Sequence, residues 1–122
     1  MKERVELKSE SETLEKWESQ MRKGMLDFII LLCLDKRESY GYELIRTIKE
    51  TAELDLSEGT IYPLLNRLRG EGLIASRWQE MESGIPRKYY RICEKGMKTL
   101  ARMTEGWARF HSSLRRLMEN EK

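Results

Sequence analysis

One short segment carries most of the side chains that could recognise another molecule by hydrogen bonding. They offer hydroxyls, one carboxamide and one guanidinium, and together with a proline they are Ser57, Thr60, Tyr62, Pro63, Asn66 and Arg67. Apolar residues recur between them at helical spacing, which predicts a helix with these groups on its outer side. Such groups pair with base edges and phosphates, so the segment predicts a binding surface.

Basic side chains gather further along the chain. Arg77 precedes the connection MESGIP (81–86), and Arg87 and Lys88 follow it. These residues suit contacts with phosphates, which position a protein on a nucleic acid without reading its sequence. The net charge is only +2, but the basic excess lies in the second half of the chain. This distribution favours an anionic partner there.

The groups that usually carry catalysis or bind metals are sparse. Cys33 and Cys93 lie far apart without a CxxC pair, and the single histidine, His111, has no nearby partner. This pattern excludes a recognisable zinc site and argues against a disulfide framework. The sequence also lacks a glycine-rich phosphate loop, a nucleophile elbow and an HExxH motif. We therefore predict a protein that is not an enzyme and that holds no metal or cofactor.

Hydrophobic periodicity predicts the helices that must position these groups. A long helix starts near residue 11 and stops at the charged stretch DKRES, and a second follows Tyr40 and Gly41. A third begins at Ser57, whose hydroxyl is expected to accept a hydrogen bond from the N–H of residue 59 or 60. Gly70 and Gly72 then end it.

Alternating residues at 73–80 and 87–92 predict a two-stranded hairpin, and a last helix covers 94–118. Three helices followed by a hairpin are typical of a winged helix-turn-helix, so the predicted fold is mainly α with a small β-hairpin wing. The expected division is a flexible segment 1–10, a DNA-binding domain 11–92 that includes the long first helix, and a C-terminal dimerisation helix 93–122.

The last helix carries an apolar seam with alternating spacings of three and four, as in a coiled coil. We predict that it pairs with a second copy, together with a stripe on the first helix. The predicted dimerisation residues are Leu14, Trp17, Met21, Leu100, Met103, Trp107, Phe110, Leu114 and Leu117. The alternative is that this helix lies on the core of its own domain.

The N-terminus, MKERVELKSESE, is polar and has no apolar stretch typical of a signal peptide. The longest apolar run, 28–34, is too short to cross a bilayer. We therefore expect a cytoplasmic protein that does not contact a membrane.

Three motifs resemble the successive signatures of the PadR family of transcriptional regulators: YGYELIRTIKE (40–50), SEGTIYPLLNRLRGEGLI (57–74) and SGIPRKYYRICEKG (83–96). The resemblance implies a winged-helix domain, a dimer built from the first and last helices, and repression that a small molecule relieves. Tyr40, at the start of the first motif, joins the expected DNA-binding residues.

The single helix after the wing resembles the compact branch of that family, some members of which bind flat aromatic drugs between subunits through a tryptophan. EGWARF (105–110) places Trp107 at the matching point. The resemblance thus implies a planar aromatic ligand on Trp107, with Met103, Phe110 and His111 around it. The alternative is that Trp107 packs in the dimer core.

The sequence departs from the family pattern at two points. Ile85 stands where the wing tip usually has arginine, which removes one expected phosphate contact. Cys93 stands where a threonine usually caps the last helix, and a thiol caps poorly.

Taken together, the residues predict a sequence-specific DNA-binding protein that acts as a homodimeric repressor on an inverted-repeat operator. The alternative is a winged-helix module that binds another protein and no operator.

Overall fold

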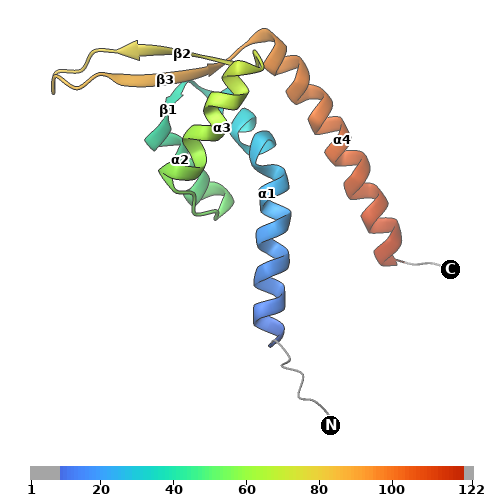
Figure 1. Cartoon of the computed structure of the whole chain (residues 1–122). Coiled ribbons are helices and arrows are strands. Elements are labelled where there is room, and N and C mark those ends of the chain that lie inside the picture. The colour runs from blue at the N-terminus through green and yellow to red at the C-terminus, as the bar shows by residue number, and fades with distance from the viewer. Residues whose placement is uncertain (1–8, 120–122) are drawn as a thin grey trace.

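The computed structural model describes residues 9–119, and its first element is helix α1 (Glu10–Lys36). It is followed in order by β1 (Ser39–Tyr40), α2 (Gly41–Ala52), α3 (Glu58–Gly70), β2 (Ile74–Gln79), β3 (Arg87–Ile92) and α4 (Glu94–Glu119). Figure 1 shows α2 and α3 beside the upper half of α1, the sheet above them and α4 descending on the other side. This arrangement confirms the predicted mainly helical winged helix-turn-helix with a long C-terminal helix.

The sequence predicts that the chain does not contact a membrane and that it starts with a flexible segment. None of the described helices combines the length and the apolar character needed to cross a membrane. The flexible segment expected at 1–10 lies outside the described residues, except for its last two. Ser9 caps α1, since its hydroxyl accepts a hydrogen bond from the Glu12 N–H at 3.1 Å and its own N–H donates to the Glu12 carboxylate at 3.1 Å.

One hydrophobic core joins α1, α2, α3, the sheet and the first turns of α4. Its most deeply buried side chains are Ile30, Leu31, Leu44, Ile48, Ile61, Leu65, Leu68, Ile74 and Tyr90. Full burial of one such side chain contributes about 1.5–3 kcal/mol. Because α3 supplies three of these residues, its inner side is fixed on the core and its outer side is left to solvent.

The sheet has three antiparallel strands in the order β1-β3-β2. Sequence periodicity predicted β2 and β3 but missed β1, because a strand of two residues is too short to show alternation. Tyr40 of β1 pairs with Tyr89 of β3, and Trp78 of β2 pairs with Lys88 of β3. Strand β1 therefore fastens the start of α2 to the wing.

Two sequence expectations need correction. Ser57 is the N-cap of α3, but its side chain accepts no capping hydrogen bond. The Thr60 N–H donates to the Ser57 carbonyl oxygen at 3.0 Å instead, and the Ser57 hydroxyl donates to the Thr60 hydroxyl oxygen at 3.2 Å. Leu100, expected at a dimer face, is only 6% exposed and belongs to the domain's own core. The first turns of α4 pack on the sheet and α1, so Leu100 has no surface left for a partner.

Candidate nucleic-acid interface

The outer side of α3 is the most accessible part of the helix-turn-helix unit. Tyr62, Pro63 and Asn66 are exposed there, whereas Ile61 and Leu65 on the inner side are fully buried. An exposed helix of 13 residues held by its inner side has the form of an element that can enter the DNA major groove, which is about 12 Å wide.

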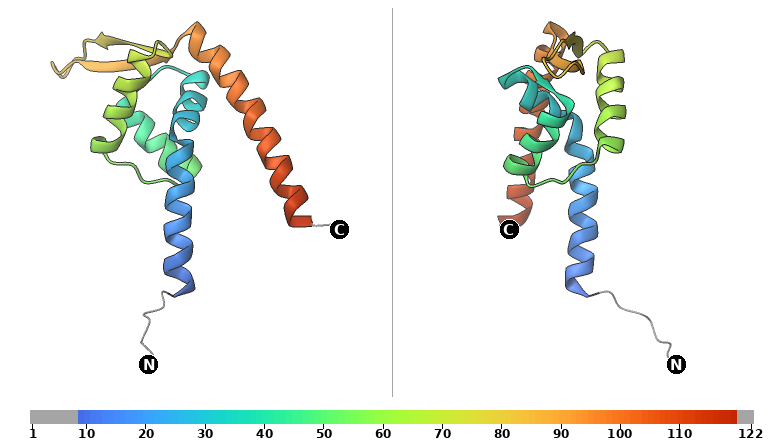
Figure 2. Two further views of the ribbon diagram at one scale, coloured as in Figure 1. Left: turned by 45° about the vertical axis from the view of Figure 1, so that its right-hand side comes forward. Right: turned by 90° about the vertical axis from the view of Figure 1, so that its left-hand side faces the viewer.

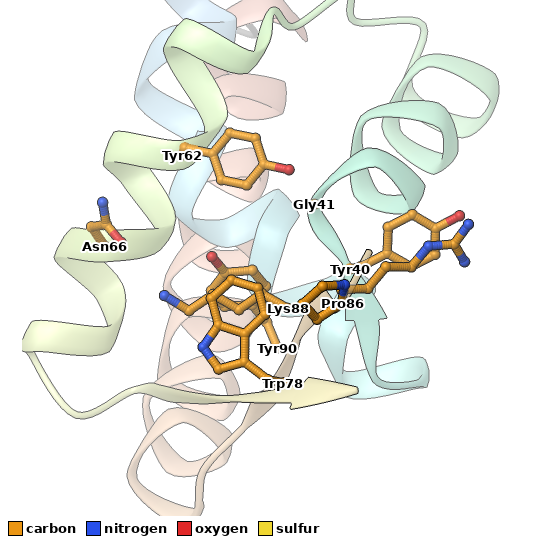
Figure 3. Close-up of a pocket in the computed structure, with 9 residues that line it drawn as sticks. Tyr40, Gly41, Tyr62, Asn66, Trp78, Pro86, Lys88 and Tyr90 are labelled. Carbon is orange, nitrogen blue, oxygen red and sulfur yellow. The ribbon is translucent and has the colours of Figure 1, made fainter. Parts of the chain in front are cut away.

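A cleft with a volume of about 400 Å³ separates α3 from the wing. Figure 3 shows Tyr62 and Asn66 on its α3 side and Trp78, Lys88 and Tyr90 on its sheet side. The full lining consists of Tyr40, Gly41, Tyr62, Asn66, Trp78, Pro86, Arg87, Lys88 and Tyr90. The fold therefore brings together five of the predicted DNA-binding residues: Tyr40, Tyr62, Asn66, Arg87 and Lys88.

The two wing cations are supported by aromatic rings. The Arg87 Cζ lies 4.3 Å from the centroid of the Tyr40 ring. The Lys88 Nζ lies 5.6 Å from the Trp78 ring and 5.9 Å from the Tyr90 ring. Cation–π contacts orient the charges without neutralising them. Within residues 9–119, neither cation forms an ion pair, so both charges remain available to phosphates.

The other two predicted arginines are held by carboxylates. The Arg67 Nη2 lies 2.7 Å from the Asp27 Oδ1 of α1. Arg77 donates from Nε and Nη2 to the two carboxylate oxygens of Glu38, both at 2.8 Å. These hydrogen bonds from Arg77 hold the pKa of Glu38 below its ordinary value. Arg67 and Arg77 are therefore paired with carboxylates, whereas, among the described residues, Arg87 and Lys88 at the cleft are not.

The remaining predicted DNA-binding residues lie beside the cleft rather than in it. Thr60 lines a separate hollow with Leu26 and Leu56 on the α1 side of α3. Ser57 is exposed at the start of α3, and Pro63 is exposed one residue after Tyr62. They border the outer side of α3 without adding to the aromatic lining.

Gly41 sets the position of Tyr62. A Cβ atom at residue 41 would lie 2.5 Å from the Tyr62 Cζ and would also collide with the Tyr62 hydroxyl oxygen. The Tyr62 ring thus packs directly on the start of α2, and burial there, followed by the negative charge of Glu58, raises the pKa of Tyr62. Only glycine leaves room for this contact.

Gly41→Ala is expected to move the Tyr62 ring and weaken binding to duplex DNA about five-fold, on the order of one lost side-chain contact. Thermal stability should change little, because the ring is at the surface and alanine favours the helix. The measurement is fluorescence anisotropy with labelled DNA. In a Tyr62→Ala background the same substitution should have no further effect, and an equal effect in both backgrounds would refute the assignment.

The apolar seam of α4 is exposed to solvent where the helix extends past the hydrophobic core. Trp17 on α1 is 55% exposed and Phe110 on α4 is 63% exposed, and Leu14, Met21, Leu114 and Leu117 are exposed as well. Met103 is half-buried against the core. Figures 1 and 2 show the first half of α1 and the second half of α4 extending away from the compact part. These two apolar faces have no cover within the described chain.

Trp107 stacks on His111, with ring centroids 5.0 Å apart and an interplanar angle of 11°.

A second cavity, of about 490 Å³ and separate from the cleft beside α3, lies between α1 and α2 and is lined by Ile29, Leu32, Cys33 and Ile48 among others. Burial raises the pKa of the Cys33 thiol, which disfavours the reactive thiolate. In residues 9–119 no group of three or more His, Cys, Asp or Glu side chains is arranged to hold a metal ion.

Sequence reasoning missed Gly41, Trp78, Pro86 and Tyr90 as cleft residues. For Trp78 a signal was present, since it lies on the same strand face as Ile74 and Ser76 and near the exposed end of the hairpin. Gly41 gave no such signal, because its closeness to Tyr62 arises from the packing of α2 on α3.

Residues 30–102 match the transcriptional regulator PadR-like family. Among solved structures, a PadR family transcriptional regulator from Eggerthella lenta is similar with a TM-score of 0.83 and 29% identity, covering 91% of this chain and 96% of that one. A PadR-like transcriptional regulator from Bacillus cereus is similar with a TM-score of 0.75 and 36% identity, covering 84% and 99% respectively.

The transcriptional activator GvpE of Haloferax mediterranei is 40% identical over 72 residues, which cover 58% of this chain. The match spans only 35% of the length of GvpE. Its similarity therefore concerns about a third of that longer protein rather than the whole of it.

Proposed function

The chain belongs to the PadR-like family of transcriptional regulators, and from this premise we propose that it is a repressor that binds operator DNA as a homodimer. The family is not enzymatic. The cleft between α3 and the wing is the observation that carries the proposal. It combines exposed polar groups on a helix, Tyr62 and Asn66, with two cations free of carboxylates, Arg87 and Lys88.

In this proposal α3 enters the major groove and the wing follows the neighbouring backbone. The Asn66 carboxamide can form two hydrogen bonds with the N6 and N7 edge of adenine. Arg87 and Lys88 contact phosphates, which set the register of α3 without reading bases. Ser57 and Thr60 stand at the N-terminus of α3, where hydroxyls and free backbone N–H groups favour a phosphate.

The two exposed apolar faces support the homodimer. Trp17 lies on the exposed apolar face of α1, and Phe110 lies on that of α4. A second copy would cover both faces, and burying these two side chains removes a large aromatic surface from water. A two-fold axis between the copies presents two α3 helices to one side of the DNA. The operator is then an inverted repeat whose half-sites are separated by one helical turn, about 34–36 Å, or a multiple of it.

Selection from a randomised duplex library tests DNA recognition; we call its product the selected duplex. We expect an inverted repeat, and we expect Lys88→Ala to weaken all sequences alike and reduce the salt slope by about one unit. Lys98→Ala, on α4 away from the wing, is the control. If no duplex is enriched and a protein partner binds instead, the chain is an interaction module.

The direction of regulation needs its own experiment, because the similar GvpE carries the name of an activator. In a purified transcription reaction with the selected duplex overlapping the promoter, we expect the protein to lower transcript yield. A rise in yield would make it an activator while leaving DNA recognition intact.

We further propose that a planar aromatic ligand binds at Trp107. The indole is 45% exposed and already stacks on His111, with Met103 and Phe110 nearby along α4, so two copies at the dimer axis would offer parallel aromatic surfaces. A ligand that favours one angle between the two α3 helices would change DNA affinity.

Titration with the planar cation ethidium should quench tryptophan emission saturably in the wild type and not in Trp107→Ala. Trp78→Ala is the matched control, because it removes an exposed tryptophan elsewhere and should keep the binding. Saturable quenching that survives Trp107→Ala would contradict the site, and so would a complete absence of binding.

A further inference from the structure

The ion pair between Arg67 and Asp27 joins two elements with different tasks. Arg67 lies on α3, Asp27 lies on α1, and the Nη2–Oδ1 distance is 2.7 Å. Within residues 9–119 it is the one side-chain hydrogen bond or ion pair that links these two helices. Figure 1 shows α3 beside the upper half of α1.

The guanidinium is directed away from the cleft. On α3, Ile61, Leu65 and Leu68 mark the inner side, and Tyr62 lies toward the wing. Arg67 follows the opposite flank, toward α1, where Glu71 adds a second carboxylate at 3.5 Å. Two carboxylates therefore face one planar donor group, and the contact with Asp27 is a charge-assisted hydrogen bond, which is directional.

Asp27 also lies on the helix that carries the proposed dimer face. Leu14, Trp17 and Met21 are exposed earlier on α1. In a symmetric dimer formed through α1, the separation of the two α3 helices depends on how each α3 sits on its own α1. The ion pair lies at that junction.

We propose that Asp27 is a positioning residue that fixes the recognition helix on α1 through Arg67 and thereby sets the half-site spacing that the dimer accepts. This inference rests on the proposed function. It gives Arg67 a different role from the base contact expected from sequence, since the guanidinium is bound to α1 rather than presented to the groove.

The test uses the full chain in four forms: wild type, Asp27→Ala, Arg67→Ala, and the exchange Asp27→Arg with Arg67→Asp. Each is titrated with the selected duplex and with duplexes that have one base pair added or removed between the half-sites. The single variants should bind the selected duplex about three- to five-fold more weakly, on the order of one solvent-exposed ion pair. They should also lose most of the preference for the original spacing.

The exchange should restore both affinity and spacing preference, because it re-forms the ion pair with the charges reversed. If Arg67 reads a base, the exchange cannot recover, because aspartate has no donor for guanine and repels phosphates. Circular dichroism confirms that each variant is folded. Glu18→Ala is the control, since it removes another carboxylate of α1, 3.8 Å from Arg22 in the same helix, and should leave both readouts unchanged.

The outcomes separate the two hypotheses. If the wild type selects a duplex but the exchange variant binds it as weakly as Arg67→Ala does, the positioning role is wrong and the proposed function stands. The same holds if the Asp27→Ala variant keeps wild-type affinity and spacing preference. A wild type that selects no duplex overturns the proposed function, and the positioning role with it.

Discussion

Phe110→Glu combined with Leu114→Glu is expected to give a monomer that binds the selected duplex about 10²- to 10⁴-fold more weakly than the wild type. Both side chains are exposed on α4, and both lie on the seam that a second copy would bury. Two carboxylates in that seam would be desolvated without partners, which opposes association strongly. Once separated, each protomer binds one half-site and loses the effective concentration that linkage provides.

Light scattering measures the first effect, with a change from twice the chain mass of 14.6 kDa to that mass. Ser112→Glu with Arg116→Glu is the matched control, because it also places two glutamates four residues apart but on the opposite side of α4. It should remain dimeric. The dimer proposal fails if wild type and the seam variant have the same mass at micromolar concentration.

Gly96→Ala is expected to lower the free energy of unfolding by about 2–3 kcal/mol and the thermal midpoint by about 10 °C. A Cβ atom on Gly96 would collide with the Leu73 carbonyl oxygen and lie 2.7 Å from an Ile92 side-chain carbon. The Leu73 carbonyl also accepts the Cys93 N–H at 2.9 Å, so it cannot retreat without breaking the start of α4. The helix must therefore shift off the sheet.

Thermal denaturation followed by circular dichroism measures this effect. Gly70→Ala is the control, because nothing lies within 4 Å of a Cβ atom there, and its midpoint should stay the same or rise. Equal midpoints for Gly96→Ala and wild type would show that α4 does not pack on Leu73 as described.

Helical periodicity sufficed to predict the four helices, because each helix buries one side on a shared core, and the alternation of residues along β2 and β3 sufficed to predict the hairpin. Strand β1 escaped because two residues cannot show a period, and it forms only when β3 is present to pair with it. Leu100 was assigned to the dimer face because its seam is continuous in sequence, whereas in space α4 leaves the core after its first turns.

The candidate interface was predictable by residue type but not by geometry. Tyr62, Asn66, Arg87 and Lys88 meet at one cleft as expected for an α3 and wing pair. The partners of Arg67 and Arg77 could not be foreseen, because Asp27 and Glu38 lie far away along the chain. Free and paired arginines look identical in a sequence, and only the fold distinguishes them.

The dissociation constant of the wild type for the selected duplex, measured across a range of salt concentrations, is the decisive test of sequence-specific DNA binding. We expect two protomers per inverted repeat and a steep fall of affinity with salt, since both wings contact phosphates. We also expect much weaker binding to a scrambled duplex at every salt concentration. Equal, salt-insensitive binding to both duplexes would contradict sequence-specific DNA recognition by this chain.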